Sequence, residues 1–210
     1  MKKHTHRSFI FGTVAFGLIV FVSLGCGIME KLKSAANTKA PDVNRPDSPP
    51  AKKTANGEKL FESNAGLQDF VTQLTAAVGS DNPNVLKLSF YDAYAMVEVQ
   101  DPKKPENIDG YTYRDGKLSP PNPVKIMGNG KISDNVFPLK DVNLDGLPAL
   151  TKEIMDKIKD VEGGHLTGYV VSRGLPFSKD VRILPLTDGT RKSISSEADK
   201  NAKLKKFEVK

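Results

Sequence analysis

The chain has very few of the residue types from which most metal and disulfide frameworks are built. Its 210 residues include no tryptophan, one cysteine and three histidines. Two of the histidines stand within the first six positions, so His165 is the only one in the body of the sequence. A zinc site usually needs several nitrogen or sulfur ligands, and a single cysteine cannot form a disulfide within the chain. We therefore expect neither, and the domain must be held together by its core.

Recognisable catalytic motifs are also missing. No nucleophile turn of the G-x-S-x-G type accompanies His165, and the glycine pair before it is not followed by the Lys-Ser/Thr of a phosphate loop. No spacing singles out a pair among the many carboxylates. We therefore expect no enzymatic activity and no catalytic residue.

The net charge of +6 is not a property of the body of the chain. Residues 27–56 hold 6 basic and 3 acidic side chains, whereas residues 57–210 hold 22 of each. A nucleic-acid-binding domain concentrates basic charge on itself, so we expect no nucleic-acid partner. We interpret the one lysine cluster near the end of the chain as an exposed strand face: Lys200, Lys203, Lys205 and Lys206.

The N-terminus has the order of an export signal. Three basic residues lie within the first seven positions, an uninterrupted apolar or small run covers residues 8–25, and the lone Cys26 follows. This order resembles the signal peptide of bacterial lipoproteins, in which the cysteine becomes the first mature residue and carries a diacylglycerol. Ser23 departs from that pattern, which prefers Leu. An uncleaved membrane span is the alternative, since 18 residues suffice to cross a bilayer.

These features divide the chain into a signal peptide (1–25), the lipidated Cys26 with a proline-rich tether (26–56), and a domain (57–210). The tether has almost no large apolar residue and cannot bury enough surface to offset its chain entropy. Both interpretations of the N-terminus place the domain outside the cytoplasm. The resemblance to lipoproteins implies a membrane-anchored envelope protein. In enteric lipoproteins, an Asp directly after the lipidated cysteine retains the protein in the inner membrane. This chain has Gly27 there, so the resemblance favours the outer membrane or the periplasmic face.

The domain contains two helix patterns in the same register. Apolar residues recur at helical spacing in each, and four positions of the first correspond to four of the second after a shift of 80. The corresponding residues are Leu67, Phe70, Leu74 and Val78, then Leu147, Leu150, Ile154 and Ile158.

Alternating strand patterns follow each helix. We predict strands over residues 86–90, 94–99, 111–113 and 117–118 after the first helix, and over 166–171, 181–186, 191–195 and 204–209 after the second. Asp-Gly pairs at 115–116 and 188–189 are hairpin turn signals. Pro185 lacks an N–H and should lie at a sheet edge or bulge. The predicted fold is α+β, with two tandem helix-plus-antiparallel-meander halves over 57–130 and 131–210.

This element order resembles the PepSY-like modules and the β-lactamase-inhibitor-protein modules, which also occur in tandem. The resemblance covers residues 60–210 and is carried by element order alone. It implies that both helices pack on one face of the sheet and that the other face is free. It also implies a non-enzymatic module that binds or modulates another protein of the envelope.

The loop over residues 173–178 is the preferred candidate for partner binding. It places Leu175 and Phe177 on a segment stiffened by glycine and proline, next to Arg173. A rigid apolar loop tip binds with little loss of entropy. The alternative is that both apolar side chains fold back into the core. Tyr111 and Tyr113 are a second candidate, because they share a strand face and tyrosine is favoured at interfaces; ordinary sheet packing is the alternative for them.

A candidate calcium motif precedes the second helix. Asp141, Asn143 and Asp145 alternate before a glycine, as at the start of an EF-hand loop. The twelfth position, however, is Lys152 instead of a bidentate Glu, and a helix begins almost at once. The alternative is that Asp145 caps that helix. We therefore expect no cofactor, with a calcium or small-ligand carrier as the rival to protein binding.

Overall fold

The computed structural model describes residues 58–127 and 130–210 of the chain. The predicted signal peptide, Cys26 and the predicted tether lie outside these residues, and what is predicted for them stays a prediction. Within the described ranges, no helix combines the length and the apolar character needed to cross a membrane.

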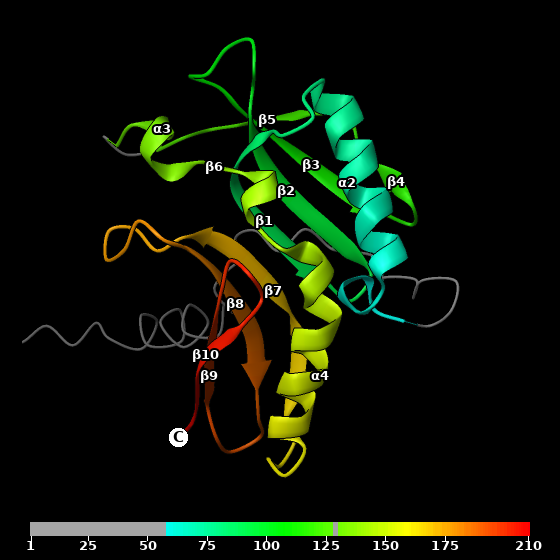
Figure 1. Ribbon diagram of the computed structural model, residues 1–210, viewed down its shortest axis with the longest axis vertical. Coiled ribbons are helices and arrows are strands. Elements are labelled where there is room, and N and C mark those ends of the chain that lie inside the picture. Colours follow the sequence, from blue (N-terminus) through cyan, green and yellow to red (C-terminus); the bar gives the residue numbers. More distant parts are fainter. Residues whose placement is uncertain (1–57, 128–129) are drawn as a thin grey trace, which may run out of the picture. The chain divides into compact units, whose positions relative to one another are not determined.

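The described part of the chain is an α+β structure with one large antiparallel sheet (Figure 1). In chain order the elements are η1 (Leu60–Glu62), α2 (Asn64–Val78), β1 (Asn84–Tyr91), β2 (Tyr94–Gln100), β3 (Ile108–Arg114), β4 (Lys117–Leu118), β5 (Asn122–Val124), α3 (Ile132–Asn135), β6 (Phe137–Pro138), η2 (Leu139–Asp141), η3 (Leu144–Gly146), α4 (Leu147–Ile158), β7 (His165–Arg173), β8 (Val181–Asp188), β9 (Ile194–Asp199) and β10 (Leu204–Val209).

The ten strands follow the order β10-β9-β8-β7-β1-β2-β3-β4, with β5 paired to β3 and β6 paired to β1. The first strand after α2 and the first strand after α4 therefore pair with each other in the middle of the sheet. In this pair, Phe90 of β1 lies opposite Tyr169 of β7, and Leu88 lies opposite Val171. The sheet is continuous across the two sequence regions (Figure 1).

Both predicted helices form, and their periodic apolar residues face the core. Helix α2 begins after Ser63, whose hydroxyl accepts a hydrogen bond from the Gly66 N–H, and ends at Gly79 in the left-handed conformation. All four predicted core positions of α4 are buried, as are three of the four in α2. Val78, the fourth, is half-buried against the same core.

Aromatic contacts connect the helices to the sheet. The Phe70 ring of α2 meets the Phe90 and Tyr113 rings edge to face, at centroid distances of 5.7 and 5.6 Å. Phe61 of η1 meets Tyr169 of β7 in the same way at 5.2 Å. These side chains belong to one core cluster that includes residues from both helices and from strands of both sequence regions.

Several details differ from the predictions. The strand expected over 191–195 lies over Ile194–Asp199, and the short elements α3, β5 and β6 had no predicted counterpart. Pro185 lies in β8, which has β7 and β9 on its two sides in the strand order. The pairs between β8 and β9 involve only Arg182 and Ile183 of β8. Pro185 lies beyond them, where only β7 pairs with β8, so this stretch of the strand is locally an edge.

Candidate partner-binding loop and its surroundings

The loop between β7 and β8 is fixed by hydrogen bonds of its own backbone. The Gly174 N–H donates to the Asp180 carbonyl at 3.0 Å, and the Gly174 carbonyl accepts from Phe177 and Ser178, also at 3.0 Å. The Ser178 hydroxyl donates to the Asp180 carboxylate at 2.9 Å. The loop therefore closes on itself through these hydrogen bonds.

Phe177 projects from this loop with 92% of its surface exposed, the largest fraction among the large apolar side chains of the described residues. The alternative in which Phe177 folds back into the core therefore does not apply. Leu175 is half-buried. The two apolar side chains of the loop thus have different environments, and only Phe177 stands free.

Arg173 lies at the base of the loop and is half-buried. Its Nε donates to the Val136 carbonyl at 2.9 Å, and its Nη1 donates to the Lys179 carbonyl. These bonds connect the loop to the segment before β6. The Arg173 guanidinium therefore holds the base of the loop through two backbone carbonyls, and its predicted role in partner binding stays a prediction.

Tyr111 and Tyr113 lie in the core and not on a contact surface. They are 7% and 5% exposed, and the Tyr113 hydroxyl donates to the Asp69 carboxylate of α2 at 2.5 Å. Burial raises the pKa of both phenols, and the Asp69 carboxylate raises that of Tyr113 further. Both tyrosines share a strand face as predicted, but it is the face that packs against α2. Neither ring is available to a partner in this fold.

The tyrosines on the opposite face of the sheet are Tyr91 and Tyr94. Their rings stack at 4.6 Å with an interplanar angle of 22°, and the Arg114 guanidinium lies 4.6 Å from the Tyr94 centroid. Met96, two residues along β2, is 49% exposed. The sequence could not separate these tyrosines from the buried pair, because the assignment depends on strand register.

The segment with Asp141, Asn143 and Asp145 borders a groove of about 640 Å³ between α2 and the residues that precede α4. Buried apolar residues such as Leu67 and Leu144 line it together with exposed polar residues such as Asp141 and Asn143. All three side chains are exposed, and the Asn143 N–H donates to the Lys200 carbonyl at 2.8 Å. Helix α4 begins at Leu147 with Gly146 as its N-cap residue, one position later than the cap assigned to Asp145.

The described residues contain no group of three or more His, Cys, Asp or Glu side chains arranged to hold a metal ion. His165 is exposed at the start of β7, and its Nδ1 lies 2.8 Å from the Gly163 carbonyl oxygen. That hydrogen bond gives His165 a local structural partner.

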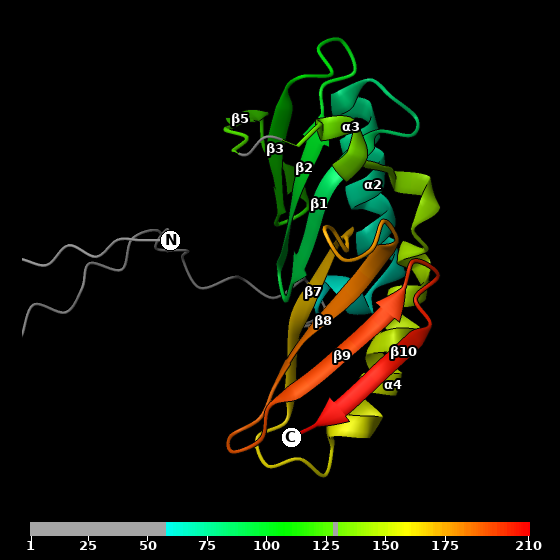
Figure 2. The same ribbon diagram turned by 90° about the vertical axis from the view of Figure 1, so that its left-hand side faces the viewer.

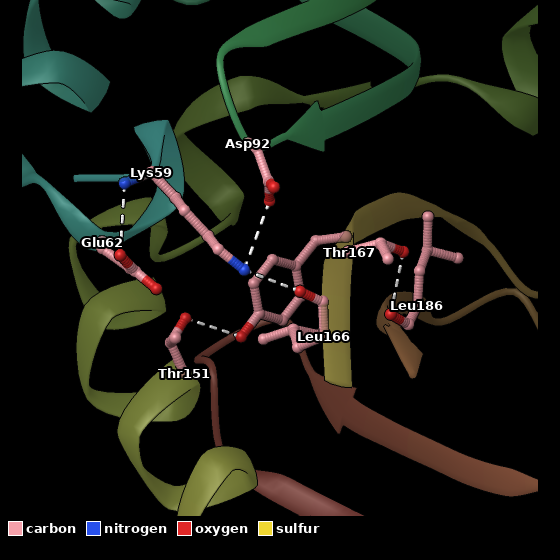
Figure 3. Close-up of polar contacts among 8 residues, drawn as sticks. Lys59, Glu62, Asp92, Thr151, Leu166, Thr167 and Leu186 are labelled. Carbon is pink, nitrogen blue, oxygen red and sulfur yellow. Dashed lines mark hydrogen bonds and ion pairs between the residues drawn. The ribbon is translucent and has the colours of Figure 1, made fainter. Parts of the chain in front are cut away.

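A polar cluster holds the start of the described chain against the middle of the sheet (Figure 3). The Lys59 ammonium donates to the Leu166 carbonyl at 2.9 Å and lies 3.3 Å from the Asp92 carboxylate. The Leu60 N–H donates to the Asp92 carbonyl at 2.8 Å. Leu60 and Phe61, the next two residues, are buried, so the described chain enters the core between the β1–β2 turn and β7.

Two further contacts shown in Figure 3 connect this cluster to α4 and β8. The Thr151 hydroxyl of α4 lies 2.8 Å from the Tyr169 hydroxyl, and both residues are buried. The Thr167 hydroxyl donates to the Leu186 carbonyl at 3.1 Å. Lys59, Thr151 and Thr167 each have a partner within the fold, so we assign this cluster to the architecture.

The sequence matches no protein family and no curated protein. Among solved structures, one from Clostridium difficile 630, described as a "putative lipoprotein", is similar with a TM-score of 0.48 and 13% identity over 73% of this chain and 99% of that chain.

Proposed function

We propose that this chain is an exported lipoprotein of the cell envelope, anchored through lipidated Cys26, whose α+β domain is a non-enzymatic module that binds another envelope protein. The order of basic residues, apolar run and lone cysteine supports the anchor. Two or more acyl chains would hold the protein firmly at the membrane, whereas a single chain binds only marginally. We place the domain on the periplasmic side or at the outer membrane.

The exposure of Phe177 is the observation that carries the binding proposal. A phenylalanine that is 92% exposed on a hydrogen-bonded loop contributes nothing to the core. Covering such a side chain in a partner's pocket is worth about 1.5–3 kcal/mol by removal of apolar surface from water. Because the loop backbone is already fixed, little conformational entropy is lost on binding.

Site-specific photocrosslinking in the native cell tests this proposal. A benzoylphenylalanine at position 177 should capture one dominant envelope protein, and the same group at Met155 of α4, which is 41% exposed, should not. Capture should fall when Cys26 is changed to Ala, because the domain is then not held at the membrane. Equal and diffuse capture from both positions would overturn the assignment of the Phe177 loop.

The groove between α2 and the segment before α4 favours a second candidate, the carriage of a small ligand. Its volume of about 640 Å³ lies within the range of small-molecule sites. Thr72 on α2 lines it, so Thr72→Trp should fill the space. Native mass spectrometry of the protein isolated from its own envelope would reveal a bound small molecule that the variant loses. The absence of such a molecule would favour protein binding.

We also propose that the domain consists of two similar halves with both helices on one face of the sheet. The symmetric strand order about the β1–β7 pair supports this, as does the position of α2 and α4 on one side of the strands in Figure 2. The test is superposition of residues 58–127 on 131–210. A fit no better than that between unrelated α+β fragments would overturn the proposal.

A further inference from the structure

The last strand of the sheet, β10, pairs with β9 and with no other strand of the described residues (Figure 2). At the other end of the sheet, β4 and β5 are two and three residues long, whereas β10 has six. The edge of a strand presents unpaired N–H and C=O groups that another chain can join. We propose that the free edge of β10 is a second interaction surface, distinct from the Phe177 loop, that pairs with an extended acidic strand of a partner protein.

The hydrogen-bond pattern shows which backbone groups face outward. The Lys210 N–H donates to the Ser193 carbonyl at 2.9 Å, and the Ser193 N–H donates to the Lys210 carbonyl at 3.1 Å. In an antiparallel ladder, residues that bond to the neighbouring strand in this way alternate with residues that point away from it. Glu208 therefore bonds toward β9, while Phe207 and Val209 direct their N–H and C=O groups to the free edge.

The edge carries an excess of positive charge. Residues 203–210 contain four lysines and one glutamate. Lys206 and Lys210 each lie near Glu208, at 3.4 and 3.6 Å, and Lys205 lies 3.3 Å from Asp199. These lysine side chains are 50–73% exposed, and exposed ion pairs of this kind are weak. The lysines therefore remain able to meet carboxylates of an incoming strand.

This charge decides which strand can pair. A second copy of β10 would bring the same net positive charge beside the first, and this excess opposes self-pairing even where an antiparallel copy places Glu208 opposite Lys206. Lysines on edge strands are a known means of blocking such self-pairing. An acidic strand instead brings opposite charge to the same backbone groups. The lysines thus select the partner by its charge as well as preventing self-association.

The two faces of β10 further specify the partner strand. Side chains alternate along a strand, so Lys206 and Glu208 lie on one face and Phe207 and Val209 on the other. Val209 is 38% exposed, and the Lys157 ammonium of α4 lies 5.8 Å from the Phe207 ring centroid. A strand that alternates carboxylates with β-branched apolar residues fits both faces: carboxylates beside Lys206 and apolar side chains beside Phe207 and Val209.

The test uses the chain from residue 26 onward with Cys26 changed to Ser. Its probe is a fluorescent peptide, acetyl-Thr-Val-Glu-Val-Glu-Val-Thr-amide, and the control peptide carries Lys in place of Glu. We expect the acidic peptide to bind, more weakly as salt is raised, and the basic peptide not to bind. Amide hydrogen exchange at Phe207 and Val209 should slow at least tenfold in the complex, because their N–H groups become hydrogen-bonded.

A proline at position 209 tests the backbone pairing most directly. Val209→Pro removes an outward N–H but no hydrogen bond to β9, and proline is tolerated at such edge positions. It should weaken peptide binding at least tenfold, whereas Val209→Ala should change it less than twofold. Lys206→Glu should also weaken binding of the acidic peptide, because it places a carboxylate beside the peptide's own.

Several results would overturn the proposal. One is binding that leaves the Phe207 and Val209 amides unprotected, which would mean simple ion pairing. Another is equal binding by Val209→Pro and Val209→Ala. A dimer of the chain alone that Val209→Pro disperses would show that a second copy occupies the edge. If Val209→Pro fails to fold, amide hydrogen exchange of the chain that keeps Val209 still shows whether the acidic peptide pairs with the edge of β10.

Discussion

The hydroxyl oxygens of Thr151 on α4 and Tyr169 on β7 lie 2.8 Å apart in the buried interior. We predict that Thr151→Val lowers the free energy of unfolding by about 1–3 kcal/mol, because it leaves the Tyr169 hydroxyl buried without a partner. Adding Tyr169→Phe should recover part of that loss. Urea unfolding of the two single variants and the double variant measures the coupling, and strictly additive losses would show that the two hydroxyls do not depend on each other.

Stability should decrease at alkaline pH. Burial raises the pKa of Tyr169 above its ordinary value, the Thr151 hydrogen bond opposes the rise and the Glu62 charge adds to it. A folded-state pKa above the unfolded value favours the neutral phenol in the folded state. This stabilisation is fully present below pH ~10, the unfolded pKa, and is lost as the pH rises beyond it. Tyr169→Phe should reduce the slope of unfolding free energy against pH above that point; an unchanged slope would contradict the assignment.

Two phenylalanines provide a matched comparison of core and surface. Phe61 is fully buried and Phe177 is 92% exposed. Phe61→Ala should lower the free energy of unfolding by about 3–5 kcal/mol. Phe177→Ala should change it by less than about 0.5 kcal/mol. Denaturant unfolding measures both, and a loss of several kcal/mol for Phe177→Ala would show that the loop contributes to the core after all.

Gly168 allows the close approach of β1 and β7 at the middle of the sheet. A Cβ at this position would lie 2.1 Å from the Phe90 carbonyl oxygen, which is backbone and cannot turn aside. Gly168→Ala should therefore cost at least about 2 kcal/mol, as overpacking does. Gly130→Ala is the control, because its Cβ would meet only the Asn135 amide at 3.7 Å. Thermal unfolding of both variants tests this, and equal melting temperatures would contradict it.

We expect calcium to leave the protein unchanged. Asp141 and Asp145 are exposed, and no metal-holding group of acidic side chains is found in residues 58–127 and 130–210. A ligand that binds only the folded state raises its stability, so a calcium site would be visible as a rise in melting temperature. A shift below about 1 °C in millimolar calcium is the expected result. A larger shift that disappears in Asp141→Ala would restore the calcium interpretation.

Local features were predictable from the sequence because they depend on neighbouring residues. The helices follow from apolar spacing, and the β3–β4 turn follows from Asp115 and Gly116, which adopt positive φ angles of 52° and 73°. The β1–β7 pair has no such local signal, since Phe90 and Tyr169 are far apart in the sequence.

Long-range register also explains why the tyrosines could not be assigned. Tyr111 lies opposite Val97, and Tyr113 lies opposite Ala95, so both share the buried face of β2. A shift of one residue in this pairing would have exposed them. The sequence likewise could not predict whether Phe177 is exposed, because the same residues permit a loop that folds under the sheet.

The anchorage of Lys59 has a mechanical consequence. In the membrane-anchored protein proposed above, a pull on the chain would reach the described residues at Lys59, Leu60 and Phe61, beside the β1–β2 turn and β7, and not at a terminal strand. The load would be applied to fully packed side chains in the middle of the sheet. Tension would therefore be resisted by many contacts at once, and β10 would not be peeled away as the first event.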